Sequence, residues 1–227
     1  ELGALVSGFA LPPATSPNLY EALSLAENVT TVVGDINIYA DVASAIDRLA
    51  PEIVFHLAAQ PLVSVGYDEP LNTFGTNIMG TLHVLEAARN CPQTRAVVCI
   101  TTDKVYLNRE THEGYREGDR LGGKDPYSAS KACAEIVASA YVQTMAARGN
   151  GVAIATARGG NIIGGGDWSR DRIIPDYVRA KANGEPLLIR NPESTRPFQH
   201  VMSLVHGYML LGSHLLREGR SQNSVWN

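Results

Sequence analysis

The chain has 227 residues, of which 44% are hydrophobic and 19% charged, and these values are typical of a globular protein with one large core. A net charge of −4 and a pI near 5.9 exclude the basic surface that attracts nucleic acid or an anionic membrane. Three scattered cysteines, Cys91, Cys99 and Cys133, are too few for a disulfide framework or a metal site. We therefore expect a cytoplasmic protein that binds neither nucleic acid nor membrane.

From its start, the chain alternates short β-like runs with helical patterns. The runs cover residues 4–10, 29–33, 53–57, 96–100 and 152–156, and helical patterns cover 19–25, 41–49, 70–90 and a long segment after Asp125. The run at 53–57 is nearly all apolar, as in a strand buried on both faces. Strands separated by helices imply βαβ units, so we expect an α/β fold with a Rossmann-like, doubly wound parallel sheet.

The pattern changes after about residue 160. A glycine-rich segment at 159–166 lacks the Lys-Ser/Thr ending of a P-loop, and a helical pattern at 173–183 follows it. Strand-like pieces cover 187–189 and 198–201, and polar residues and glycines interrupt an apolar stretch at 201–216, which we interpret as a buried helix. We expect a dinucleotide-binding domain at 1–160 and a small, irregular substrate-binding portion at 161–227.

Both ends have features of an incomplete fold. The chain opens as if at the end of a first helix, without the G-x-x-G-x-x-G turn that holds a pyrophosphate in such folds. At the other end, Val225-Trp226-Asn227 stops as if entering a further strand. We expect a fragment that lacks parts of both domains.

The segment from Thr101 to Lys131 carries the strongest chemical signal. A strand ends in Thr101-Thr102-Asp103-Lys104, and a helical pattern begins at Tyr127-Ser128-Ala129-Ser130-Lys131. Residues four apart share one helix face, so the Tyr127 phenol and the Lys131 ammonium point the same way. A fixed cation lowers the pKa of a phenol and makes it a base for a hydroxyl proton. Such a pair also arises by chance, but its place one loop after a strand end, where open sheets bind ligands, favours function.

Several motifs together resemble one family. They are Thr101–Tyr106, the Tyr127/Lys131 pair, His56–Val63, Thr76–Thr81 and Arg158–Trp168. The chain resembles the extended short-chain dehydrogenase/reductases over nearly its whole length, and within them most closely the CDP-glucose 4,6-dehydratases. It departs from many relatives at Ile38-Tyr39-Ala40, which is unusual after Asn37. It departs again at Val65-Gly66, where many relatives carry a basic residue and Ser.

The resemblance implies a three-stage reaction on NAD. Tyr127, assisted by Thr102 and steered by Lys131, takes the proton of the glucose 4-hydroxyl as hydride passes from C4 to NAD. Lys104 then removes the C5 proton, Asp103 protonates the departing C6 hydroxyl, and hydride returns to C6. These roles require burial that raises the pKa of Asp103 and lowers that of Lys104. Outside this context, an Asp-Lys pair is more often a solvated turn with a salt bridge.

The resemblance also implies contacts of lower specificity, for which strand-end packing is an equal alternative. The residues implied in cofactor binding are Asp35, Ile36, Leu57, Ala58, Ala59, Gln60, Asn77 and Thr101, together with Tyr127 and Lys131. Asn161 and Arg196 match positions that hold the nucleotide diphosphate, and Arg suits phosphate because it can donate two parallel hydrogen bonds. The spacing of His200, His206 and His214 fits no metal-ligand pair, so we expect no metal.

The choice of NAD over NADP is argued by exclusion. No Asp or Glu ends the run Val6-Ser7-Gly8-Phe9, so the usual partner of the ribose hydroxyls is not visible. The first Arg is Arg48 and the first Lys is Lys104, so no cation near that strand could meet the extra phosphate of NADP. NAD is therefore favoured.

Two other classes of protein stay open. A nucleotide-sugar 4-epimerase, or another nucleotide-sugar dehydratase, would share Tyr127 and Lys131, but an epimerase has no use for the acid and base at 103 and 104. A non-catalytic Rossmann-like binding protein need not keep Tyr127, Lys131 and Asp103 together. The family likeness also predicts a homodimer formed through the long helices.

Overall fold

The computed structural model describes residues 3–147, 151–219 and 224–227. The expected helix end at Glu1 and Leu2 lies outside these ranges. In the N-terminal part, strand β1 (Ser7–Ala10) pairs in parallel with β2 (Thr30–Val33). Helix α1 (Leu19–Ala22) and the 3-10 turn η1 (Leu25–Glu27) connect them, and α2 (Tyr39–Leu49) follows. The strands and helices predicted here are confirmed within one to three residues at most ends, β1 being three residues shorter at its start.

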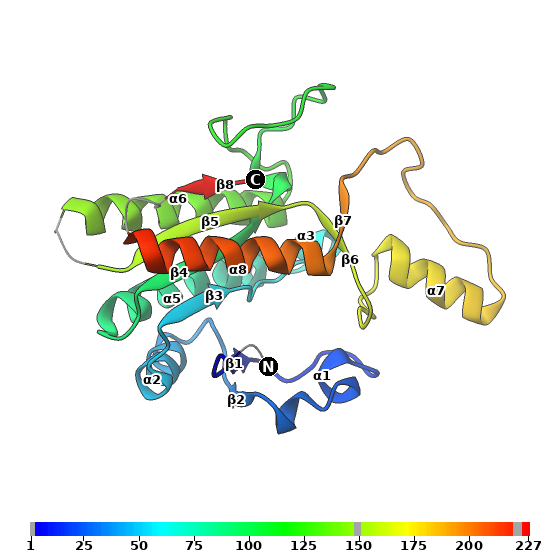
Figure 1. Ribbon diagram of the computed structural model, residues 1–227. Coiled ribbons are helices and arrows are strands. Elements are labelled where there is room, and N and C mark those ends of the chain that lie inside the picture. Colours follow the sequence, from blue (N-terminus) through cyan, green and yellow to red (C-terminus); the bar gives the residue numbers. More distant parts are fainter. Residues whose placement is uncertain (1–2, 148–150, 220–223) are drawn as a thin grey trace.

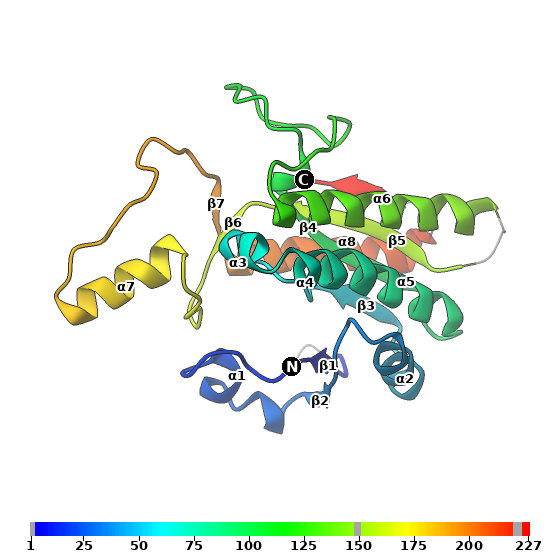
Figure 2. The same ribbon diagram turned by 180° about the vertical axis from the view of Figure 1, so that it is seen from behind.

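A four-stranded parallel sheet forms the centre of the molecule. Its order is β3 (Ile53–His56), β4 (Ala96–Thr102), β5 (Ala153–Gly159) and β8 (Val225–Trp226). Helices α5 (Gly80–Asn90) and α6 (Pro126–Ala147) cover one face, and α8 (Val201–Glu218) covers the other (Figures 1 and 2). The doubly wound α/β fold is thereby confirmed, as is a strand at 225–226.

Side chains alternate between the two faces along β4. Val97 and Cys99 pack in one core cluster with residues of α5 and α6, whereas Ala96 and Val98 pack in a second cluster with Tyr208, Leu211 and Leu215 of α8. A strand has a side-chain period of two, so both of its faces must be apolar when helices cover both. This is why residues 96–100 form an unbroken apolar run.

The sheet differs from the expected single sheet in one respect. Within the described residues, β1 pairs only with β2, and β3 pairs only with β4, so the strands form separate hydrogen-bonded sheets. Strand β3 is therefore an edge strand, and Ile53, Val54 and Phe55 are half-buried where full burial was expected.

The predicted helix at 70–90 begins and ends where expected, but a π-helical turn interrupts its α-helical structure. After α3 (Val63–Asp68), helix α4 (Pro70–Phe74) leads into a π-helical turn, η2 (Gly75–Met79), which continues directly into α5. A π turn holds one extra residue and changes which face of the helix a side chain occupies. Here it contains the buried Asn77.

The C-terminal part contains a smaller parallel pair, β6 (Asn161–Ile163) with β7 (Phe198–His200). Helix α7 (Ile173–Asn183) has the bounds that its sequence predicts, and it projects away from the sheet (Figure 1). The predicted strand at 187–189 is wrong: this segment has no regular structure, because no strand of the described part of the chain pairs with it and Leu188 is 83% exposed. The division at residue 160 stays a prediction, although α8 and β8 pack against and pair with the central sheet.

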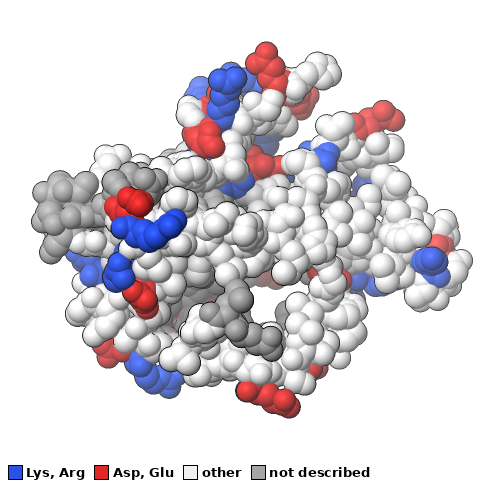
Figure 3. Space-filling view, viewed as in Figure 1, with Lys and Arg blue, Asp and Glu red and all other residues white. Residues whose placement is uncertain are grey.

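The predicted apolar helix at 201–216 is α8, and only one of its faces is buried, since Met202, Val205 and Met209 are exposed. Among the described residues, no helix has the length and apolar character needed to span a membrane. On the face shown in Figure 3, acidic and basic side chains are interspersed.

Candidate active site

The carboxyl end of β4 forms the floor of the candidate site. Strand β4 ends at Thr102, and a single 3-10 turn, η3 (Asp103–Val105), reverses the chain there. The Thr102 hydroxyl caps this turn: it donates to Asp103 Oδ1 at 2.9 Å and accepts from the Lys104 N–H at 3.3 Å. These contacts fix the two residues predicted to act as acid and base at one strand end.

Tyr127 is held against this turn by the start of α6. Asp125 caps the helix, accepting from the Ser128 N–H at 2.9 Å and the Ser128 hydroxyl at 2.7 Å. The preceding loop presses on the first helical turn at Gly123, where a Cβ would lie 2.1 Å from the Ala129 nitrogen, so only glycine fits. The helix therefore begins in a fixed position, with Tyr127 in its first turn.

The structure brings Thr102, Asp103, Lys104 and Tyr127 together. The Lys104 ammonium lies 5.7 Å from the centre of the Tyr127 ring, and the Thr102 hydroxyl is near enough to the Tyr127 phenol to lower its pKa. A base for a hydroxyl proton thus lies beside an amine and a carboxyl group, all within the reach of one sugar ring.

The pKa of Tyr127 is raised above its ordinary value, chiefly because burial disfavours the phenolate. The hydrogen bond with Thr102 lowers it, the Asp103 and Asp125 carboxylates raise it, and the Arg172 charge lowers it. The expectation that a neighbouring cation leaves this pKa lowered is wrong in direction, because desolvation exceeds the favourable contacts.

Lys131 lies on the same helix but is engaged elsewhere. Its ammonium donates to the Ile100 carbonyl at 2.8 Å, and burial lowers its pKa to about 8, while Cys99 and Glu135 raise it. Because one of its three N–H groups is used in this way, the ammonium has further donors with which to bind a ligand at the strand end.

Asn77 ties the loop after β3 to α6. Its side chain accepts from the Gln60 N–H at 2.8 Å and donates to the Gln60 carbonyl at 3.1 Å and to the Ser130 hydroxyl at 2.8 Å. Gln60 in turn donates to Thr73 at 2.8 Å. The predicted cofactor residues Asn77 and Gln60 therefore form a rigid polar support, while Leu57 and Ala58 are exposed and Ala59 is half-buried at the sheet edge.

The other predicted cofactor residues occupy different settings. Asp35 follows β2 and accepts from the Asn37 N–H at 2.9 Å, whereas Ile36 is buried and its carbonyl hydrogen-bonds His83 at 2.9 Å. The Thr101 hydroxyl donates to Glu135 on α6. The side chain of Ile36 is thus used in packing and that of Thr101 in a hydrogen bond, so neither side chain is free to bind a ligand.

Glu135 and Arg158 form a buried ion pair beneath the site. The Arg158 guanidinium donates to both Glu135 carboxylate oxygens, at 3.1 and 2.9 Å, and the Thr156 hydroxyl donates to Glu135 at 2.8 Å. Arg158 also donates to the Tyr106 hydroxyl at 2.8 Å. The pair joins β5, α6 and the segment after η3, and so fixes the end of β4 from behind.

The two predicted phosphate-binding residues meet through the β6–β7 pair. The Asn161 N–H donates to the Pro197 carbonyl at 2.9 Å, which brings Arg196 close to Asn161 in space. The Arg196 guanidinium is exposed and donates only weakly, at 3.4 Å, to the Thr195 carbonyl. Asn161 is the first residue of β6 and Arg196 lies two residues before β7, and their role stays a prediction.

Comparison with known proteins assigns the family. The GDP-mannose 4,6 dehydratase family matches residues 14–220, which is most of the chain. The chain belongs to this family. Over its full length it is 46% identical to a CDP-glucose 4,6-dehydratase of Salmonella typhimurium, of which it covers 64%, so it spans about two thirds of that relative's length. It is 26% identical to a dTDP-D-glucose 4,6-dehydratase of Dictyostelium discoideum over 78% of this chain and 40% of that one.

Solved structures show the same fold in a dehydratase and in an epimerase. A dTDP-glucose 4,6-dehydratase of Streptomyces venezuelae, crystallised with NAD and a second ligand, superposes with a TM-score of 0.81 at 23% identity, over 98% of this chain and 66% of that one. A UDP-glucose 4-epimerase of Thermotoga maritima gives 0.81 at 18% identity, over 100% of this chain and 78% of that one. At these identities the likeness establishes the fold alone.

Arg172 is a charged residue of the candidate site that the sequence pattern did not predict. Arg172, at the start of α7, is close enough to Tyr127 for its charge to lower the phenol pKa, and it pairs with Asp167 at 3.0 Å. Asp167 and Arg172 follow the glycine-rich segment, and no local pattern reveals that Arg172 comes near Tyr127.

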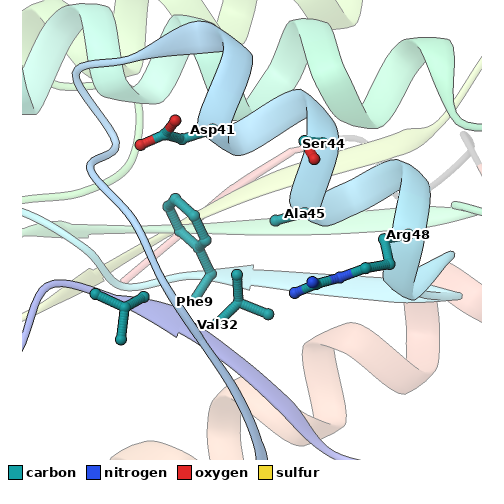
Figure 4. Close-up of a pocket in the computed structure, with 7 residues that line it drawn as sticks. Phe9, Val32, Asp41, Ser44, Ala45 and Arg48 are labelled. Atoms are coloured by element: carbon teal, nitrogen blue, oxygen red, sulfur yellow. The ribbon is translucent and has the colours of Figure 1, made fainter.

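A small pocket of about 170 Å³ lies elsewhere, between β1, β2 and α2 (Figure 4). Phe9 and Val32 line its strand side, and Asp41, Ser44 and Arg48 line its helix side. None of the predicted catalytic residues lines it. We place the chemistry at Tyr127, because the interacting titratable groups gather there and not in this pocket.

Proposed function

We propose that the protein dehydrates CDP-glucose to CDP-4-keto-6-deoxyglucose with NAD as a bound cofactor. One observation carries the proposal: Thr102, Asp103, Lys104 and Tyr127 meet at the end of β4 in a chain that is 46% identical to a CDP-glucose 4,6-dehydratase. When bound, NAD supplies the acceptor for the electron pair of the sugar C4–H bond and returns it at C6.

The donor set at the strand end fits a dinucleotide. The exposed backbone at 57–58 offers carbonyl and N–H groups at the carboxyl edge of the sheet, where such folds bind cofactors. Asn77 keeps that loop in place, and Lys131 has N–H groups with which to hold ribose hydroxyls.

The first residue to act is Tyr127. As phenolate it accepts the proton of the sugar 4-hydroxyl, while Thr102 holds the phenol oxygen in place through its hydrogen bond. Burial raises the cost of the phenolate, so the charge of Arg172 and the Thr102 hydrogen bond are needed to make it accessible.

The elimination of water falls to Asp103 and Lys104. Once C4 is a ketone, the C5 proton is acidic, and Lys104 takes it as the base. The carboxyl group of Asp103 donates a proton to the C6 hydroxyl, which leaves as water. The 3-10 turn of η3 presents both groups from consecutive positions, so that one face of the sugar meets both.

The test is product analysis with three substrates. The intact protein is incubated with CDP-glucose, UDP-glucose or dTDP-glucose and catalytic NAD, and each mixture is examined for a 4-keto-6-deoxy product. Product from CDP-glucose at a kcat/KM well above the other two supports the proposal. Product only from another nucleotide sugar would replace CDP-glucose as the substrate, and a C4 epimer without dehydration would identify an epimerase.

The family likeness also supports a homodimer through α5 and α6. Ile136, on α6, is 59% exposed, which gives this helix an apolar contact residue on its outer side. Light scattering after size exclusion should give the mass of two chains, and a monomer at the assay concentration would count against the dimer.

A further inference from the structure

The hydroxyl of Tyr208 is buried without a hydrogen-bond partner. Tyr208 lies on α8 and is 7% exposed, and within the described ranges its oxygen is the one buried side-chain polar atom that finds no partner. An unpaired buried hydroxyl costs free energy that a Phe ring would avoid. Its presence therefore calls for a use outside folding.

The fold places this hydroxyl beside the candidate site. Val98 of β4 and Ala157 of β5 pack with Tyr208 in one cluster, and the period of two puts Thr102 and Gly159 on the same face of the sheet. Thr102 and Gly159 are direct register partners on neighbouring strands. A Cβ on Gly159 would lie 3.2 Å from the Tyr208 oxygen. The hydroxyl thus reaches the strand position next to Thr102.

Thr102 needs a second donor when Tyr127 is ionised. In the structure the single Thr102 proton is donated to Asp103 at 2.9 Å. Once Tyr127 has lost its proton to water, its oxygen can only accept, and Thr102 must turn its proton toward it. The Thr102 oxygen accepts from the Lys104 N–H at 3.3 Å, and its other lone pair is open to a new donor.

We propose that Tyr208 is a positioning residue that donates its proton in a hydrogen bond to the Thr102 oxygen while Thr102 donates to the Tyr127 phenolate. The proposal deepens the proposed function, because the phenolate is the base of that reaction. Hydrogen bonds in a chain polarise one another, so the outer hydroxyl strengthens the inner one.

Charged and titratable groups lie around Tyr127 on several elements. The titratable and charged groups are Asp103 and Lys104 on η3, Asp125 before α6, Lys131 on α6, Arg172 at the start of α7 and Tyr208 on α8. Burial, with a smaller contribution from Tyr127, raises the pKa of Tyr208 to about 12. Tyr208 therefore keeps its proton and remains a donor at neutral pH.

The test removes only the oxygen, in Tyr208→Phe of the intact protein. The ionisation of Tyr127 is followed by ultraviolet difference titration against Tyr127→Phe, which needs no activity. We expect the pKa of Tyr127 to rise by about 0.5 to 1 in Tyr208→Phe, kcat below that pKa to fall about 3- to 10-fold with KM unchanged, and stability to stay the same or increase.

Tyr141→Phe is the matched control. Tyr141 donates to Glu86 at 2.7 Å on the far part of α6, so its loss should lower stability and leave the Tyr127 titration unchanged. An unchanged Tyr127 pKa in Tyr208→Phe overturns the proposal, whether or not stability changes. A raised pKa in a protein that forms no dehydrated product would retain the role of Tyr208 and reject the proposed function.

Discussion

The ammonium of Lys104 lies over the ring of Tyr127, 5.7 Å from its centre. The two proposed bases of the reaction are therefore packed on each other, one for the C4 hydroxyl and one for C5. A cation over an aromatic face is attracted to it, so the contact orders the flexible lysine before substrate enters. Because the two bases are different residues, a substitution of Lys104 can test its role while Tyr127 stays in place.

Replacing Lys104 by Met should stop elimination and spare the first step. The change removes the proposed C5 base, so dehydration should fall by roughly 10²- to 10⁴-fold, while the Tyr127 site stays intact. Deuterium incorporation at C5 from heavy water measures the step directly. Lys124→Met is the control, since Lys124 makes only an exposed pair with Glu110 at 3.4 Å. Undiminished C5 exchange in Lys104→Met would assign the base elsewhere.

Replacing Lys131 by Met should stabilise the fold and abolish activity. The pKa of Lys131 is lowered to about 8 from 10.5 in the unfolded chain, so folding carries a cost that is complete below pH 8 and vanishes above 10.5. After subtracting the lost hydrogen bond to Ile100, unfolding at pH 7 should require about 1–3 kcal/mol more. Urea denaturation should show a smaller increase in the free energy of unfolding at pH 9.5 than at pH 7.

Lys181→Met, at an exposed position on α7, is the control and should leave the free energy of unfolding unchanged at both pH 7 and pH 9.5. A Lys131→Met protein that is less stable at pH 7 would show that the ammonium supports the fold more than burial opposes it.

Stability should fall as the pH drops below 6.5, because of His56. Burial, with a smaller contribution from Lys131, lowers the pKa of His56 to about 3, and its ring hydrogen-bonds Thr81 at 3.0 Å. The unfolded chain takes up a proton near pH 6.5 and the folded one does not, so the free energy of unfolding should decrease by about 1.4 kcal/mol per pH unit below 6.5.

Denaturation between pH 6.5 and 5, above the titration of most carboxylates, isolates this slope. His56→Gln should remove most of it, and His206→Gln, at an exposed position on α8, should retain it. Equal slopes in both variants would contradict the assignment to His56.

Breaking the ion pair of Glu135 with Arg158 should be costly. Both side chains are almost fully buried, at 2% and 3% exposure, so Arg158→Met leaves a carboxylate without its charge partner and should lower stability by about 3–5 kcal/mol. Arg95→Met breaks an exposed pair with Glu52 and a hydrogen bond to the Leu216 carbonyl at 2.6 Å, and should cost about 1–2 kcal/mol. If the two variants lose equal stability, the buried ion pair contributes no more to stability than the exposed one.

The sequence alone determined the elements and the chemical segment of this protein. The helix at 173–183 and the strands at 96–100 and 225–226 follow from local side-chain patterns, and the spacing of Tyr127 and Lys131 puts both on one helix. These features depend on residues close in the chain, where the period of a helix or a strand fixes direction.

Only the tertiary structure decided which groups act on one another. It separated β1 from β3, left 187–189 without a partner strand, and turned Thr101 toward Glu135. It also made burial outweigh the favourable charges in the pKa of Tyr127, and brought Arg172 and Tyr208 to the site from distant segments. Desolvation and pairing depend on what packs against a group from elsewhere in the chain, and no local pattern contains that information.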